Sequence, residues 1–181
     1  LSHGGIYDRE LYGETVDIDG DTAIVTQHCS DIGCNHSLVD AYVRTGTTWT
    51  YQQQLAYTYN NMQPHGYVAS LSGNTVLIGV PYSGATKVGE MQIWVRNGNS
   101  WVGQYGTVAP VPVTNGQFGS RIALEGDIAA VSGPAASGGV GIYVYVRNGT
   151  TWTQTQVLQP NGTTGHGVIG ISGNTMLVNS S

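Results

Sequence analysis

Three closely spaced aspartates near the start of the chain have the spacing of a cation-binding loop. Asp17, Asp19 and Asp21 alternate with Ile18 and Gly20, and alternating carboxylates can surround a hard cation such as Ca²⁺. The same strand-and-turn pattern recurs later in the chain, where Ser, Ala or Asn replaces most of these carboxylates. We therefore expect no calcium at Asp17, Asp19 and Asp21, and no metal or cofactor elsewhere.

The two cysteines, Cys29 and Cys34, lie in the longest predicted loop, residues 27–37. With His28 and His36 they could supply four ligands to zinc, although the spacing matches no common zinc module. A local disulfide between Cys29 and Cys34, suited to an oxidising compartment, is the interpretation we prefer. Two free thiols are the remaining alternative.

An arginine followed five residues later by a tryptophan recurs three times. The pairs are Arg44 with Trp49, Arg96 with Trp101, and Arg147 with Trp152. Recurrence at one repeat position indicates a structural role, so we expect the tryptophans to pack between repeats and the arginines to cover apolar surface or bond carbonyls. The alternative is a set of sugar pockets between repeats, in which each tryptophan is a stacking platform and repetition gives avidity.

Some aromatic residues do not recur, and these are candidates for a unique ligand contact. They are Trp94, Tyr57, Tyr59 and Tyr82. Catalytic residues are not expected, because the sequence shows no nucleophile elbow, phosphate loop or paired carboxylates at a repeated pocket. The histidines His3, His65 and His166 are isolated in the sequence. We therefore predict that the protein is not an enzyme.

Recurring turns predict the elements that position these residues. The glycines of the first turn are 53, 53 and 47 residues apart: Gly20, Gly73, Gly126 and Gly173. Each lies between short runs of β-branched and aromatic residues, as in β-hairpins, and no apolar stripe with helical spacing is present. We therefore predict an all-β protein made of four-stranded antiparallel units. The predicted segments are a lead-in at 1–10, repeats at 11–64, 65–116 and 117–163, and half a repeat at 164–181.

The third repeat resembles a known family. Phe118-Gly119, then residues 122–127 (IALEGD) and 131–134 (VSGP), are similar to the FG-GAP repeat of integrin-alpha-type β-propellers. The resemblance runs over residues 11–178, with the phenylalanine replaced in the other repeats. It implies four-stranded blades arranged around an axis, usually seven. Three and a half repeats give only part of such a ring, so the rest would come from a longer chain or from partners, including other copies.

Composition limits the class of partner and compartment. Charged residues make up 9% of the chain, Lys87 is the single lysine, and the net charge is −5, which argues against a nucleic-acid surface. No apolar run approaches the roughly 18 residues of a membrane span. The polar, weakly charged composition is typical of secreted β proteins, so we predict an extracellular or cell-surface protein. Its glycan acceptors would be Asn35, Asn148, Asn161 and Asn179.

These observations predict a non-catalytic binding or adhesion scaffold that recognises a protein or a glycan through its loop face. One alternative is a structural subunit of a fibre, an appendage or a surface layer. The second alternative is a lectin with sugar pockets between its blades.

Overall fold

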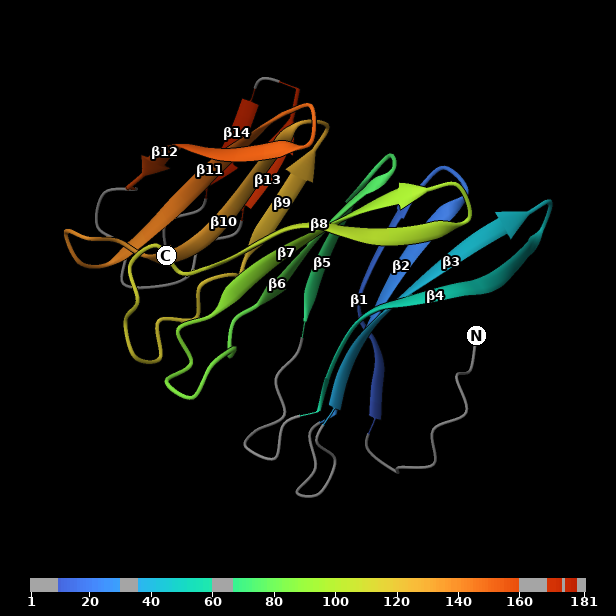
Figure 1. The fold of residues 1–181 in the computed structure, drawn as a ribbon, viewed down its shortest axis with the longest axis horizontal. Coiled ribbons are helices and arrows are strands. Elements are labelled where there is room, and N and C mark those ends of the chain that lie inside the picture. Colours follow the sequence, from blue (N-terminus) through green and yellow to red (C-terminus); the bar gives the residue numbers. More distant parts are fainter. Residues whose placement is uncertain (1–9, 30–35, 60–66, 160–168, 174, 179–181) are drawn as a thin grey trace.

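The computed structural model describes residues 10–29, 36–59, 67–159, 169–173 and 175–178. Within these residues the chain forms strands and turns, and no helix (Figure 1). The predicted all-β class and the antiparallel pairing of the strands are therefore confirmed for this part of the chain.

The strands form three four-stranded sheets and one two-stranded hairpin, each in chain order. The first sheet consists of β1 (Glu10–Asp19), β2 (Thr22–Cys29), β3 (His36–Thr45) and β4 (Thr48–Tyr59). The second consists of β5 (Val68–Ser72), β6 (Thr75–Val80), β7 (Glu90–Asn97) and β8 (Ser100–Val108). The third consists of β9 (Ile122–Glu125), β10 (Ile128–Pro134), β11 (Val140–Asn148) and β12 (Thr151–Leu158). The hairpin consists of β13 (Ile169–Ser172) and β14 (Thr175–Val178).

The repeated glycines close tight hairpin turns. In both kinds of turn, a glycine is the first residue of the loop and has a φ between 55° and 62°. This left-handed conformation favours glycine because a Cβ atom would be strained there. The turn glycines thus fix where each pair of strands begins and ends.

The sheets stand side by side in a row (Figure 1). The first strands of successive units, β1, β5, β9 and β13, contact one another along this row, while β4, β8 and β12 lie at the opposite edges of their sheets. Within the described residues the row is open and does not close into a ring.

The apolar core lies between successive sheets. We call the face of a four-stranded sheet that meets the next unit along the chain its rear face, and the opposite face its front face. Ile24 on the rear face of the first sheet clusters with Leu71 and Ile78 on the front face of the second. Leu77 on the rear face of the second sheet clusters with Leu124 of the third, and the third sheet meets the β13–β14 hairpin in the same way. Each such side chain contributes about 1.5–3 kcal/mol through burial.

The Phe-Gly pair of the third repeat joins the second and third sheets. Phe118 is fully buried, and its amide donates a 3.0 Å hydrogen bond to the Val88 carbonyl. Gly119 approaches the second sheet so closely that a Cβ on Gly79 would lie 2.0 Å from the Gly119 carbonyl oxygen. Glycine at position 79 is therefore required by this contact.

Candidate functional site

The three aspartates near the start of the chain bond protein donors and do not converge on a common centre. Asp17 accepts a 2.8 Å hydrogen bond from the Leu71 amide, and Asp19 accepts one of 2.6 Å from the Gly73 amide. Asp21 pairs with Arg44 at 2.8 Å. In the described part of the chain, no three His, Cys, Asp or Glu side chains come together as metal ligands.

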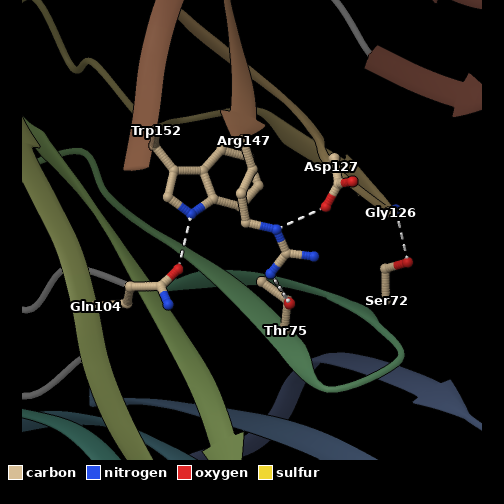
Figure 2. A network of polar contacts seen from close by, with 7 residues as sticks. All are labelled: Ser72, Thr75, Gln104, Gly126, Asp127, Arg147 and Trp152. Atoms are coloured by element: carbon tan, nitrogen blue, oxygen red, sulfur yellow. Dashed lines mark hydrogen bonds and ion pairs between the residues drawn. The ribbon is translucent and has the colours of Figure 1, made fainter. Parts of the chain in front are cut away.

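The bond from Asp19 belongs to a series that sequence reasoning missed. The residue before each first-turn glycine accepts a hydrogen bond from the turn glycine of the next unit. Ser72 bonds the Gly126 amide at 2.9 Å (Figure 2), and Glu125 bonds the Gly173 amide at 2.8 Å. The signal was present in the sequence, because Asp, Ser, Glu and Ser precede the four turn glycines and all carry an acceptor.

The repeated tryptophans are tied to the preceding sheet. Trp101 donates its indole N–H to Gln52 at 3.0 Å, and Trp152 donates to Gln104 at 3.1 Å (Figure 2). Both tryptophans are only 3% exposed. Their rings are therefore covered, so they cannot serve as open platforms for sugars, whereas Trp49 on the front face of the first sheet is half-buried.

The repeated arginines cover these tryptophans. The guanidinium carbons of Arg44, Arg96 and Arg147 lie 5.5, 5.0 and 5.3 Å from the centroids of the adjoining tryptophan rings. The sequence left two roles open for these arginines, to cover apolar surface or to bond carbonyls, and the structure places them over the tryptophan rings with side chains as their polar partners. Arg147 bonds Asp127 at 2.6 Å and the Thr75 hydroxyl of the second sheet at 2.9 Å (Figure 2).

The structure places Trp94, which does not recur, in an open groove of the second sheet. The groove has a volume of about 560 Å³ and is lined by β7 and β8, within the range of about 300–1,000 Å³ common for ligand sites. Gly103 pairs directly with Trp94, and Gly106 pairs with Gln92, so these four residues share one face of the sheet. Without side chains on the two glycines, nothing from β8 covers Trp94 and Gln92.

This arrangement is confined to the second sheet. In the first sheet, Tyr51 and Gln54 take the places of Gly103 and Gly106. In the third sheet, Gln154 and Val157 take them. The glycines therefore open a groove where the other two sheets carry side chains. Sequence reasoning singled out Trp94 but missed Gly103 and Gly106, whose signal is the exchange of two side chains for glycine within an otherwise repeated strand.

A chain of hydrogen bonds fixes the polar groups of the groove. The Trp94 indole N–H donates to the side-chain oxygen of Gln92 at 3.3 Å. The side-chain NH₂ of Gln92 donates to the Glu90 carboxylate at 2.8 Å. The second oxygen of Glu90 accepts a 2.8 Å bond from Ser83. Burial raises the pKa of the nearby Tyr67 hydroxyl, and the charge of Glu90 raises it further.

The candidate Tyr82 lies at a second, smaller hollow. This hollow has a volume of about 280 Å³ and is lined by residues of β1, by Tyr67 and Val68 at the start of β5, by the loop after β6 and by residues of the segment before β9, among them Arg121. The Lys87 ammonium lies 5.9 Å from the centroid of the Tyr82 ring. The linings of this hollow and of the groove share no residue, so Tyr82 and Trp94 do not form one site.

A tyrosine cluster occupies the front face of the first sheet. Tyr12 hydrogen-bonds both Tyr42 and the buried Asp40, and the Tyr51 ring meets the Tyr42 ring edge-on at 5.8 Å. Burial raises the pKa of Tyr12, and the hydrogen bond to Tyr42 and the charge of Asp40 raise it further. Burial also raises the pKa of Tyr51. The hydroxyls of Tyr12 and Tyr51 therefore stay protonated at physiological pH.

Several predicted residues fall outside the part of the chain that the structure describes. Of the four predicted glycan acceptors, only Asn148 lies in the described part of the chain, and it is exposed beside its turn glycine. The undescribed positions are Cys34, Asn35, Asn161 and Asn179, together with the side chains of His28, Cys29, His36, Tyr57 and Tyr59. The disulfide therefore stays a prediction.

No family model matches the chain, and no curated protein matches its sequence. The resemblance to the FG-GAP repeat therefore rests on the residues alone. Within the described residues, no helix is long and apolar enough to cross a membrane.

Proposed function

We propose that this protein is a non-catalytic binding scaffold of the extracellular space and that it holds a neutral glycan in the groove of the second sheet. The observation that carries the proposal is the pairing of Gly103 and Gly106 with Trp94 and Gln92 at the groove, because the other two four-stranded sheets described carry side chains at these positions. The site lies on a sheet face, in place of the loop face expected from the sequence.

The groove offers the groups that bind a sugar ring. An indole presents an apolar surface with a polar edge, which suits the C–H face of a sugar. Gln92 and Glu90 provide amide and carboxylate groups that bond hydroxyls. Because the hydrogen bonds from Trp94 to Gln92 and from Gln92 to Glu90 already hold these side chains, little conformational entropy is lost on binding.

Charge favours a neutral ligand. Glu90 is the charged residue of the groove lining, and the whole chain carries a net charge of −5. Like charges repel at short range, so a glycan with carboxylates or sulfates would bind less tightly than a neutral chain of the same length.

The wider setting supports an extracellular repeat scaffold. The low content of charged residues and the single lysine are typical of secreted β proteins. The first strands lie in a row, and the same contacts recur between successive sheets. These features support the proposal that the sheets are blades of an FG-GAP-like propeller.

The test is a glycan array probed with the wild-type chain and with two groove-filling variants. Gly103→Gln introduces the residue of the third sheet at this position, and Gly106→Val does the same. A Cβ would meet nothing closer than 3.9 Å at position 103 and 3.6 Å at position 106, so both variants should fold. We expect saturable binding of neutral glycans by the wild type and at least tenfold weaker binding by each variant.

The matched control is Val102→Gln, which changes an exposed residue on the opposite face of the same strand, and it should bind like the wild type. The proposal is wrong if no glycan binds saturably, or if both groove-filling variants keep wild-type affinity.

A further inference from the structure

Three successive units meet at the smaller hollow with residues from equivalent positions. Each unit contributes the sixth and the fifth residue before its first-turn glycine. These residues are Glu14 and Thr15, Tyr67 and Val68, and Ser120 and Arg121. The hollow therefore lies on the row formed by the first strands, and the repeat itself builds its frame.

The same hydrogen bond fixes this point of the backbone in the first and third units. The Thr15 amide donates to the Thr26 hydroxyl at 2.9 Å, and the Arg121 amide donates to the Ser132 hydroxyl at 3.0 Å. The side chains are not repeated, and they change from the carboxylate of Glu14 in the first unit to the guanidinium of Arg121 in the third. A repeated frame with unlike side chains presents a combination of groups that no single unit carries.

The described cations that have no part in the arginine–tryptophan pairs gather at this hollow. Of the six Lys and Arg residues, three are the repeated arginines, and Arg9 lies outside the described residues. The two that remain are Arg121, which lines the hollow, and Lys87, whose ammonium lies 5.9 Å from the ring centroid of the lining residue Tyr82. Arg121 is exposed, its guanidinium donates to the Ser120 carbonyl at 2.8 Å, and no described carboxylate pairs with it.

Two strained backbone positions also meet at this hollow. Lys87 and Gln117 have φ values of 53° and 52°, in the left-handed region that residues other than glycine rarely adopt. The Gln117 amide donates to the Lys87 carbonyl at 3.3 Å, and Gln117 is itself part of the lining. Such conformations persist where the surrounding structure imposes them, and they are common at ligand sites.

We propose that this hollow binds a small molecule with a single carboxylate, of the size of an acidic monosaccharide. The planar guanidinium of Arg121 pairs with the carboxylate through two parallel hydrogen bonds, and Lys87 adds a second positive charge beside Tyr82. The volume of about 280 Å³ lies just below the range of about 300–1,000 Å³ common for ligand sites, which suits one sugar ring. The site is separate from the glycan groove of the proposed function, because the two linings share no residue.

The rest of the lining favours a ligand that is singly charged and carries hydroxyls. Glu14 belongs to the lining, so a second negative charge on the ligand is repelled. The side-chain amide of Gln117 offers both donors and an acceptor to hydroxyl groups, and Pro81 and Tyr82 supply apolar surface for the face of a ring. These groups together fit a sugar acid better than a phosphate dianion.

The test is a calorimetric titration of the full chain with D-glucuronate, D-glucose and inorganic phosphate. Glucose has the same ring as glucuronate without the carboxylate. We expect saturable binding of glucuronate, and at least tenfold weaker binding of glucose and of phosphate. Arg121→Gln removes the guanidinium at an exposed position, so this variant should fold and should bind glucuronate at least tenfold more weakly than the wild type.

Arg44→Gln is the matched control for net charge, since Arg44 is an exposed arginine outside the lining of the hollow. Gly103→Gln is the control for the groove, and both variants should bind glucuronate like the wild type. The proposal is overturned if glucuronate does not bind saturably, if glucose or phosphate binds as tightly, or if Arg44→Gln weakens binding as much as Arg121→Gln. Loss of binding in Gly103→Gln would place the sugar acid in the groove and also overturns it.

Discussion

At the level of single residues, side-chain acceptors hold each sheet to the next. Gln52 and Gln104, each three residues after a repeated tryptophan, accept the indole N–H of the following tryptophan. These bonds lie beside the buried rings of Trp101 and Trp152. A buried donor that loses its partner costs about 1–3 kcal/mol, so these glutamines contribute to stability as well as to orientation.

Trp152→Phe tests this contribution. The substitution removes the indole N–H and leaves the Gln104 oxygen facing an apolar ring, so we expect the free energy of unfolding to fall by about 1–3 kcal/mol. Urea denaturation measures the change. The control is Trp49→Phe at the same repeat position, where the half-buried ring should make the loss less than half as large. Equal losses at both positions would mean that the contact with Gln104 contributes nothing.

The sequence predicts which residues repeat better than it predicts what they touch. The tryptophans and arginines could be assigned to a repeated frame because their spacing is regular. The partners could not be assigned, because Gln52 and Trp101 come from different sheets and meet only after both have folded. Asp17 and Asp19 show the same limit, since their spacing suggests a cation and their contacts are amides of the second sheet.

At the level of elements, close backbone approach joins the second and third sheets. Gly89 forms a parallel bridge with Phe118, and the Gly119 amide bonds the Ser132 carbonyl at 2.8 Å. Gly79 lies directly beneath Gly119. The segment before β9 can therefore reach the second sheet only where that sheet has no side chain.

Gly79→Ala should break this junction. Its Cβ would lie 2.0 Å from the Gly119 carbonyl oxygen, and overpacking of this kind costs about 1–3 kcal/mol or more. We expect a lower melting temperature and faster amide exchange in β9. Gly170→Ala is the control, because a Cβ there meets nothing within 4 Å. If Gly79→Ala is as stable as this control, the close approach is not a constraint on the fold.

The strands and turns were predictable because they depend on local chemistry. Positive φ selects glycine at the turns, and β-branched runs select the strands, so hairpins could be placed from the sequence. The groove could not be predicted in this way. In the sequence, Gly103 and Gly106 are two glycines within a predicted strand, with nothing to show which residues they pair with. Only the pairing of β7 with β8 shows that they face Trp94 and Gln92.

At the level of the whole molecule, one repeated interface accounts for the apolar core between the sheets. The clusters between sheets contain equivalent residues in each unit. The groove departs from this repetition on a single sheet. We therefore assign stability to the repeated positions, and the proposed ligand binding to the position that differs.

The most direct test of glycan binding is an NMR titration that follows the indole N–H resonances with each neutral glycan that binds on the array. We predict a saturable shift of the Trp94 resonance, because its ring lies in the groove. The resonances of Trp101 and Trp152 should stay in place, because their rings are buried and their N–H groups are bonded to glutamines. A glycan that binds and leaves Trp94 unchanged, or that shifts Trp101 or Trp152 instead, would contradict the account.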